Sequence, residues 1–242
     1  MKLKIRNEQT LYKTPLSPAY WKDAAAQLGN VRIICIAAIL IALRIVLKSA
    51  YIPVGENLNI TFGFFVNALG AMVFGPVIAI IGAAISDTLG AILFPTGTYF
   101  FPFIFVEIAG SLIFALWLWR AKLSTTRIIL SRFCVSLVCN FIMNPIIMNI
   151  YYEWLGNGKS YKFVTLPRVV KNLALFPVEA FLLVLFLGLV APILTKIHII
   201  PKAQVEYRPE MTKKHIVLLI VLLIISVIAV ALFYKVWLPS QA

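Results

Sequence analysis

The chain has 242 residues, of which 62% are hydrophobic and 13% are charged, and its mean hydropathy is +0.95. Soluble domains are roughly 45–50% apolar and about 25% charged. The composition therefore excludes a soluble globular domain, a disordered chain and a disulfide scaffold, and it indicates an integral membrane protein. The net charge of +13 would suggest nucleic-acid binding in a soluble protein.

The first thirty residues predict a basic cytoplasmic tail. They contain several lysines and arginines and lack the apolar core of a secretion signal. A short interfacial helix is expected over residues 18–29.

Apolar stretches near the roughly 20 residues that a spanning helix needs follow one another along the rest of the chain. The second and third are separated only by Gly75 and Pro76, which predict a tight turn. The predicted spans are 31–48, 58–74, 76–93, 99–119, 128–151, 169–194 and 214–237. They divide the chain into a tail (1–30), a six-helix membrane domain (31–195), a cytoplasmic linker (196–212) and an extra C-terminal transmembrane helix (213–242).

The distribution of lysine and arginine predicts the orientation. With the N-terminus inside, most of the 22 basic residues fall in the tail and in the loops that follow even-numbered spans. Cytoplasmic loops of membrane proteins carry this excess, so a cytoplasmic N-terminus is expected. The same distribution explains most of the net charge without nucleic acid.

Four basic residues do not fit this topology signal. Arg44 and Lys48 on the first span, and Arg168 and Lys171 on the sixth, reach the same outer depth. Asn172 lies four residues after Arg168 and shares its helix face. Ionisable groups in spans are costly and usually mark function, so the cluster predicts an anion site that faces outside. The alternative is that these side chains snorkel to lipid phosphates.

The fifth span carries polar residues at i+4 spacing: Arg132, Ser136, Asn140 and Asn144. Arg132 lies near the inner end of the span and is expected to snorkel to the cytoplasmic surface. Asn144 both donates and accepts hydrogen bonds, as a heterocycle edge requires. Hydrogen bonding between helices explains Asn144 equally well and is favoured for Ser136 and Asn140.

Carboxylates and aromatic rings complete the predicted binding region. Asp87 reaches the depth of Arg44 and is a ligand candidate, whereas structural ion pairing is favoured for Glu107 and Glu179. Phe94 and Tyr99 stand in an aromatic loop between the third and fourth spans. This loop is either a stacking lid over a flat ligand or an interfacial aromatic belt.

On the first span, Ala38 and Ala42 form a small-xxx-small pair that permits close helix packing. At about 100° per residue, Arg44 lies on roughly the opposite face. One face therefore suits a protein partner and the other suits the bundle interior. No nucleotide-binding or hydrolase motif is present in the sequence, so an enzyme is not predicted.

Residues 31–195 resemble the substrate-binding membrane subunits (S components) of energy-coupling factor (ECF) vitamin transporters, and specifically the folate subfamily. The resemblance rests on short motifs in the sequence: AILIALR at 38–44, FGP at 74–76, GAAISD at 82–87, FPTGTYF at 94–100, LPRVVKN at 166–172 and FP at 176–177. The basic N-terminal extension and the seventh helix are departures from that six-helix pattern.

The resemblance implies an all-α integral membrane S-component bundle in the cell membrane of a prokaryote, with no cofactor. Folate is expected to bind near the outer face. Ala38 and Ala42 are expected to dock on a transmembrane coupling subunit that carries two ATPase subunits. The expected binding residues are Arg44 and Lys171 for the glutamate carboxylates with Arg168 assisting, Asp87 and Asn144 for the pterin, and Tyr99 and Phe94 for the lid. Asn172 belongs to the same binding set.

Three other functions stay open on the sequence. One is an S component for another anionic vitamin, such as pantothenate. A second is an autonomous ion-coupled carrier that needs no ATPase. A third is a structural membrane protein without a ligand.

Overall fold

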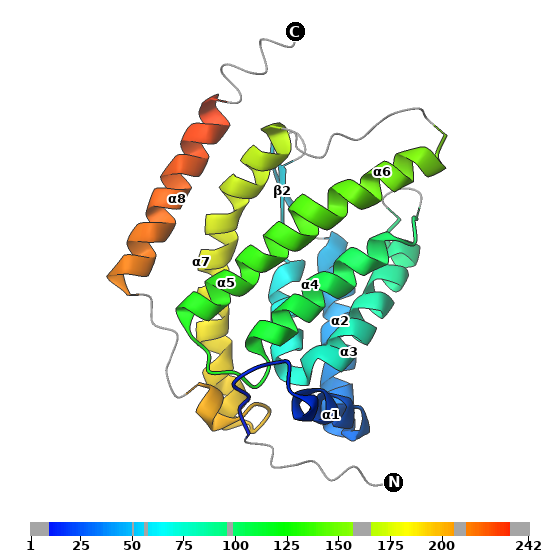
Figure 1. Cartoon of the computed structure of the whole chain (residues 1–242), viewed down its shortest axis with the longest axis vertical. Helices are drawn as coiled ribbons and strands as arrows, with labels where there is room; N and C mark the ends of the chain where they lie inside the picture. Colours follow the sequence, from blue (N-terminus) through cyan, green and yellow to red (C-terminus); the bar gives the residue numbers. More distant parts are fainter. Residues whose placement is uncertain are drawn as a thin grey trace.

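The computed structural model describes residues 10–49, 51–55, 58–95, 99–156, 166–205 and 212–232, and its elements form a bundle of helices with one small hairpin. Figure 1 shows the N-terminal helix at one end of the bundle and the hairpin at the other end. The predicted all-α bundle is confirmed apart from this hairpin.

The N-terminal part begins with α1 (Pro18–Ala26), where Ser17 caps the helix and Pro18 occupies its first turn. The short 3-10 helix η1 (Gln27–Gly29) follows, and the predicted interfacial helix is therefore present. The chain then bends by 85° into α2 (Val31–Ser49), which covers the residues of the predicted first span.

The hairpin consists of β1 (Tyr51–Gly55) and β2 (Leu58–Thr61), paired antiparallel with Ile52 opposite Ile60. The expectation that the second span begins at residue 58 is wrong. β-Branched residues in both segments favour an extended backbone, and the strands satisfy each other's hydrogen bonds before the helix starts at Gly63.

The predicted turn at Gly75-Pro76 is confirmed inside α3 (Gly63–Leu93). Gly75 has φ 79° and ψ −179°, a conformation that L-residues with a Cβ avoid. Figure 1 shows the cyan first half of α3 and its teal second half running in different directions. A Cβ on Gly75 would lie 2.7 Å from the Trp119 ring, so the turn also packs tightly against the end of α4 (Phe103–Leu118).

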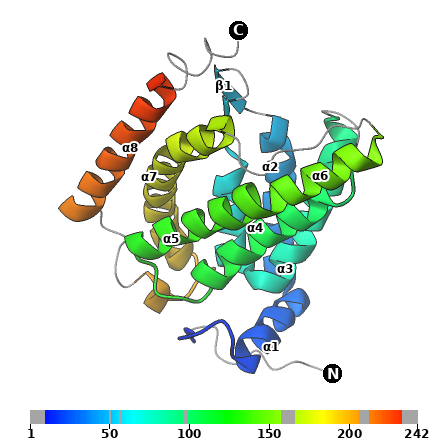
Figure 2. The ribbon, with the colours of Figure 1, turned by 45° about the horizontal axis from the view of Figure 1, so that its top comes forward.

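The fifth predicted span is one long helix in three parts: α5 (Thr125–Val135), the π-helical segment η2 (Ser136–Met143) and α6 (Asn144–Trp154). It runs alongside α4 in both views (Figures 1 and 2). Pro145 cannot donate a backbone hydrogen bond, and its ring opposes the carbonyl four residues earlier. The backbone N–H of Asn144 bonds instead to the Cys139 carbonyl five residues back, which is the π pattern.

The C-terminal part holds α7 (Leu166–Lys196), the 3-10 helix η3 (Lys202–Gln204) and α8 (Lys213–Leu232). α8 stands at the side of α7, at the edge of the bundle (Figure 1). The prediction that α8 crosses the membrane as a separate unit stays a prediction.

Three helices within the described residues are long and apolar enough to cross a membrane: Gly63–Leu93, Thr125–Trp154 and Leu175–Lys196. The apolar α4 is shorter, because Pro102 stands at its N-cap and the helix ends at Leu118. The core lies between α3, α4, α5 and α7 and includes Met72, Phe114 and Leu183, all fully buried. The chain is a multi-pass membrane protein.

Candidate functional site

Arg44 is the centre of a polar cluster that α2, α3 and α4 build inside the bundle. Its side chain is only 9% exposed and forms an ion pair with Glu107 on α4. The guanidinium also donates to Asn67 Oδ1 at 3.1 Å and to Ser111 Oγ at 2.9 Å. Ser111 in turn donates to the same Asn67 oxygen at 2.7 Å. The structural role that the sequence favoured for Glu107 is therefore confirmed.

This arrangement decides what Arg44 can do chemically. An arginine cannot lose its charge in a protein, so a buried one needs a carboxylate and several acceptors. Glu107 supplies the carboxylate, and its side chain is still 31% exposed. Arg44 is thus held in a fixed orientation, with its charge already balanced within the protein.

A second polar cluster joins the long fifth helix to α7. Arg132 is buried and forms an ion pair with Glu179, with its Nε 3.1 Å from the carboxylate. It also lies over the Phe64 ring, 5.1 Å from the centroid. The expectation that Arg132 snorkels to the cytoplasmic surface is wrong, because Glu179 neutralises it inside the bundle. Structural pairing of Glu179 is confirmed.

Two amides connect the same helices farther along. Asn140 donates through Nδ2 to Asn172 Oδ1 at 2.8 Å. The sequence favoured an interhelical hydrogen bond for Asn140, and this is confirmed. Asn172, which the sequence placed with the basic cluster, already has this protein partner. The half-buried Asn144 lies one turn farther along, at the start of α6.

The aromatic loop splits into an inner part and an outer part. Phe100 is buried and packs against Tyr151 and Trp154, with ring centroids 5.2 and 5.5 Å apart. Phe94 and Tyr99 are exposed, at 40% and 42%. Phe100 therefore anchors the loop to α6, while the two predicted lid residues lie at the surface.

The other predicted ligands fall into two groups. Asp87 is buried in the second half of α3 at 8% exposure. Arg168 and Lys171 belong to the first turns of α7, and their side chains lie outside the described residues. The structure therefore brings Arg44 together with Glu107, Asn67 and Ser111, and it does not test the predicted meeting of Arg44 with Lys171.

Sequence reasoning missed Asn67 and Ser111 as partners of Arg44. Asn67 is the one polar side chain in the apolar run from Gly63 to Phe74, and Ser111 lies one turn after Glu107 on α4. A polar residue at membrane depth usually faces a partner helix, so this signal was available.

The Ala38–Ala42 face of α2 is exposed, together with Ile39 and Leu43, whereas Arg44 faces the bundle interior. The predicted separation of the two faces is confirmed. Small residues on an exposed helix face leave room for another helix to approach closely.

Comparison with known proteins places this geometry in a family. The curated relatives include two proteins named folate transporter FolT. The one from Clostridium novyi (strain NT) is 32% identical over 62% of this chain and 85% of its own length. The one from Leuconostoc mesenteroides is 33% identical over 59% of this chain and 77% of its own length. A FolT crystal structure with bound folic acid is 27% identical, has a TM-score of 0.54, and covers 62% of this chain and 88% of that one. The family model of the ECF transporter substrate-specific component matches residues 32–187, and the chain belongs to that family.

Proposed function

We propose that the chain is the high-affinity folate-binding subunit of an ATP-driven ECF-type vitamin uptake transporter. The observation that carries the proposal is the likeness to FolT, which extends over 88% of the folic acid-bound chain. The family is a class of transporter subunits, so substrate binding rather than catalysis is the activity we propose.

The chemistry of folate suits the polar and aromatic groups of the bundle. Folate combines a flat pterin, which needs stacking and amide-type hydrogen bonds, with a glutamate that carries two carboxylates. We assign the pterin to Asp87 and Asn144, the lid to Tyr99 and Phe94, and the carboxylates to Lys171 and Arg44, with Arg168 and Asn172 assisting.

The ion pair between Arg44 and Glu107 sharpens this assignment. A cation that already has a carboxylate partner gains less from a second one than a cation without such a partner. Arg44 therefore shares its guanidinium between Glu107 and the ligand, which reduces its own attraction for the ligand.

The coupling partner and the orientation belong to the same proposal. The exposed Ala38–Ala42 face docks on the transmembrane coupling subunit, which carries two ATPases. The distribution of lysine and arginine supports a cytoplasmic location for the basic tail and the loops at the α1 end. The test is whether a protease added to intact cells leaves an N-terminal epitope tag uncut.

The decisive experiment is mass spectrometry of small molecules that co-purify with the detergent-extracted chain, followed by titration of the emptied protein with folate. Bound folate and saturable binding are expected. Preferential binding of pantothenate would identify an S component for another anionic vitamin. Uptake by liposomes that contain only this chain would identify an ion-coupled carrier, and no thermal shift with any vitamin would indicate a protein without a ligand.

A further inference from the structure

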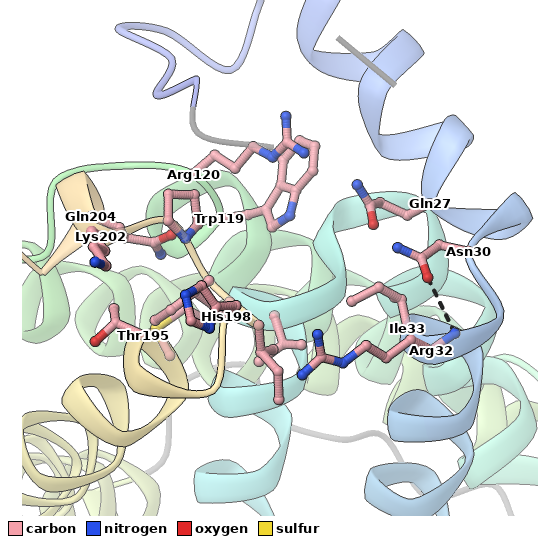
Figure 3. Close-up of a pocket in the computed structure, with 15 residues that line it drawn as sticks. Gln27, Asn30, Arg32, Ile33, Trp119, Arg120, Thr195, His198, Lys202 and Gln204 are labelled. Atoms are coloured by element: carbon pink, nitrogen blue, oxygen red, sulfur yellow. Dashed lines mark hydrogen bonds between the residues drawn. The ribbon is translucent and has the colours of Figure 1, made fainter. Parts of the chain in front are cut away.

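A pocket of about 190 Å³ opens at the α1 end of the bundle, and Figure 3 shows its lining. The η1–α2 junction, the end of α4 and the segment after α7 form its walls. Most of its lining residues, including Gln27, Asn30, His198, Lys202 and Gln204, lie outside residues 32–187, which match the family. The pocket is therefore built largely by the flanking segments of this chain.

Basic side chains are prominent in the lining. Arg32, Lys202 and His198 border the pocket, and none of its described lining residues is a carboxylate. In Figure 3, His198 stands between Arg32 on one side and Lys202 and Gln204 on the other. Arg120 also borders the pocket, but it forms an ion pair at 3.1 Å with Asp23, which is not one of the lining residues. Cations around a cavity whose described lining holds no carboxylate attract an anion.

The amide of Gln204 supplies a second, independent observation. This side chain is 1% exposed, and its Nε2 donates to the Leu118 carbonyl at 2.8 Å, which fixes the orientation of the amide. Its Oε1 is buried and accepts no hydrogen bond from the described residues. A buried acceptor without a donor is costly, so the pocket favours an occupant that donates an N–H or O–H there.

The backbone holds these groups in place. The Gln204 carbonyl accepts the Leu123 N–H at 2.8 Å, which ties η3 to the loop after α4. Arg32 Nη2 donates to the Ile197 carbonyl at 2.6 Å, which ties α2 to the end of α7. Both sides of the pocket are thus fixed before any ligand binds.

We propose that this pocket binds a phosphate ester that carries a free hydroxyl group. The phosphate oxygens meet Arg32, His198 and Lys202, and the hydroxyl donates to Gln204 Oε1. Gln27, Asn30 and Thr195 offer further hydrogen bonds to the same ligand. A glycerophosphate group satisfies this chemistry, either as the headgroup of an anionic lipid or as a free ester.

The first test measures thermal unfolding of the purified full chain with glycerol 3-phosphate, methyl phosphate or inorganic phosphate, each at the same ionic strength. Saturable stabilisation by glycerol 3-phosphate is expected, with weaker binding of methyl phosphate because it lacks the hydroxyl. Equal affinities for these two esters would contradict the role of Gln204. A parallel arm compares nanodiscs of phosphatidylglycerol and phosphatidylcholine, with native mass spectrometry to count retained lipid.

The two arms distinguish the sources of the ligand. Stabilisation by the soluble ester alone identifies a free ester, and specific retention of phosphatidylglycerol identifies a lipid headgroup. No stabilisation by the soluble ester and no preference between the two lipids would overturn the proposal.

Matched variants test the location. The double substitution Arg32→Ala/Lys202→Ala should weaken binding at least about tenfold, as expected for the loss of charge-assisted hydrogen bonds. The control Lys22→Ala/Lys196→Ala removes the same charge from exposed positions that do not line the pocket. If both double variants weaken binding equally, the effect comes from net charge alone, and the pocket is not the binding site. The unfolding midpoint without ligand checks that each variant folds. If the double substitution does not fold, the single substitution His198→Gln tests the same site more mildly.

Discussion

Arg120 donates to Asp23 at 3.1 Å and thereby fastens α1 to the loop that follows α4, although the two residues are 97 positions apart in the sequence. Both side chains are nearly buried, at 5% and 11% exposure. Tyr12 hydrogen-bonds to the same carboxylate, and Tyr20 packs edge-on against Trp119 at 4.8 Å. Residues 10–29 are therefore part of the folded bundle rather than a detached tail.

We expect Asp23→Asn to destabilise the chain by roughly 3 kcal/mol, because breaking a buried pair leaves the Arg120 charge uncompensated. Hydrogen exchange should rise first in residues 10–29. The neighbouring exposed Lys22→Ala is the control and should leave exchange unchanged. Equal exchange in both variants would show that the ion pair does not hold the segment.

The pair of Arg132 and Glu179 should behave as a coupled unit. Arg132→Gln or Glu179→Gln alone should each lower the free energy of unfolding by roughly 3 kcal/mol in detergent. The double variant Arg132→Met/Glu179→Leu should recover most of that loss, because apolar side chains of similar size suit the same space. Additive losses would mean that the two side chains act independently.

Gly75→Ala should destabilise the turn inside α3 by about 1–3 kcal/mol or more. The added Cβ would need the φ of 79° and would lie 2.7 and 2.8 Å from two Trp119 ring atoms. Gly63→Ala is the matched control, since its Cβ would meet nothing within 4 Å. The comparison of unfolding midpoints should separate the two, and equal midpoints would contradict the strained turn.

Lys171→Ala should weaken folate binding at least about tenfold, the size expected for a lost charge-assisted hydrogen bond. Arg44→Lys should weaken it less, because Glu107 already compensates Arg44. Isothermal titration measures both affinities, and the unfolding midpoint controls for misfolding. Unchanged affinity in Lys171→Ala would remove this residue from the site.

Burial, and then the hydrogen bond to Asp23, raises the pKa of Tyr12 above its ordinary value of 10. The folded chain thus holds this proton more tightly than the unfolded chain. The stabilisation is complete below pH 10 and disappears as the pH rises through the raised pKa. Tyr12→Phe should therefore lose less stability than the parent as the pH rises above about 10. Parallel unfolding curves would rule out this linkage.

The lengths of the apolar stretches predicted most of the helices, and Gly75-Pro76 predicted the turn within α3. Local propensity, however, outweighed hydropathy at residues 58–61, where Ile60 and Thr61 pair with β1. The start of α4 also differs from the prediction: the helix begins at Phe103 rather than at residue 99, because Pro102 stands at its N-cap. Hydropathy indicates which residues avoid water, but it does not indicate whether a helix or a strand carries them.

Depth along a span could be read from the sequence, but pairing across the bundle could not. Arg132 lies near the inner end of its helix, and only the fold brings Glu179, 47 residues later, beside it. Likewise, Arg44 was recognised as a buried cation, whereas its contacts with Asn67 and Ser111 depend on how α2, α3 and α4 are rotated.

The π segment between Val135 and Asn144 changes the rotation of the fifth helix about its own axis. On an α-helix, Arg132 and Asn140 would point about 80° apart, yet both reach α7 here. The wider π turns bring both side chains to α7, which an uninterrupted α-helix would not do. The same segment also sets the rotation of α6, where Tyr151 and Trp154 pack against Phe100.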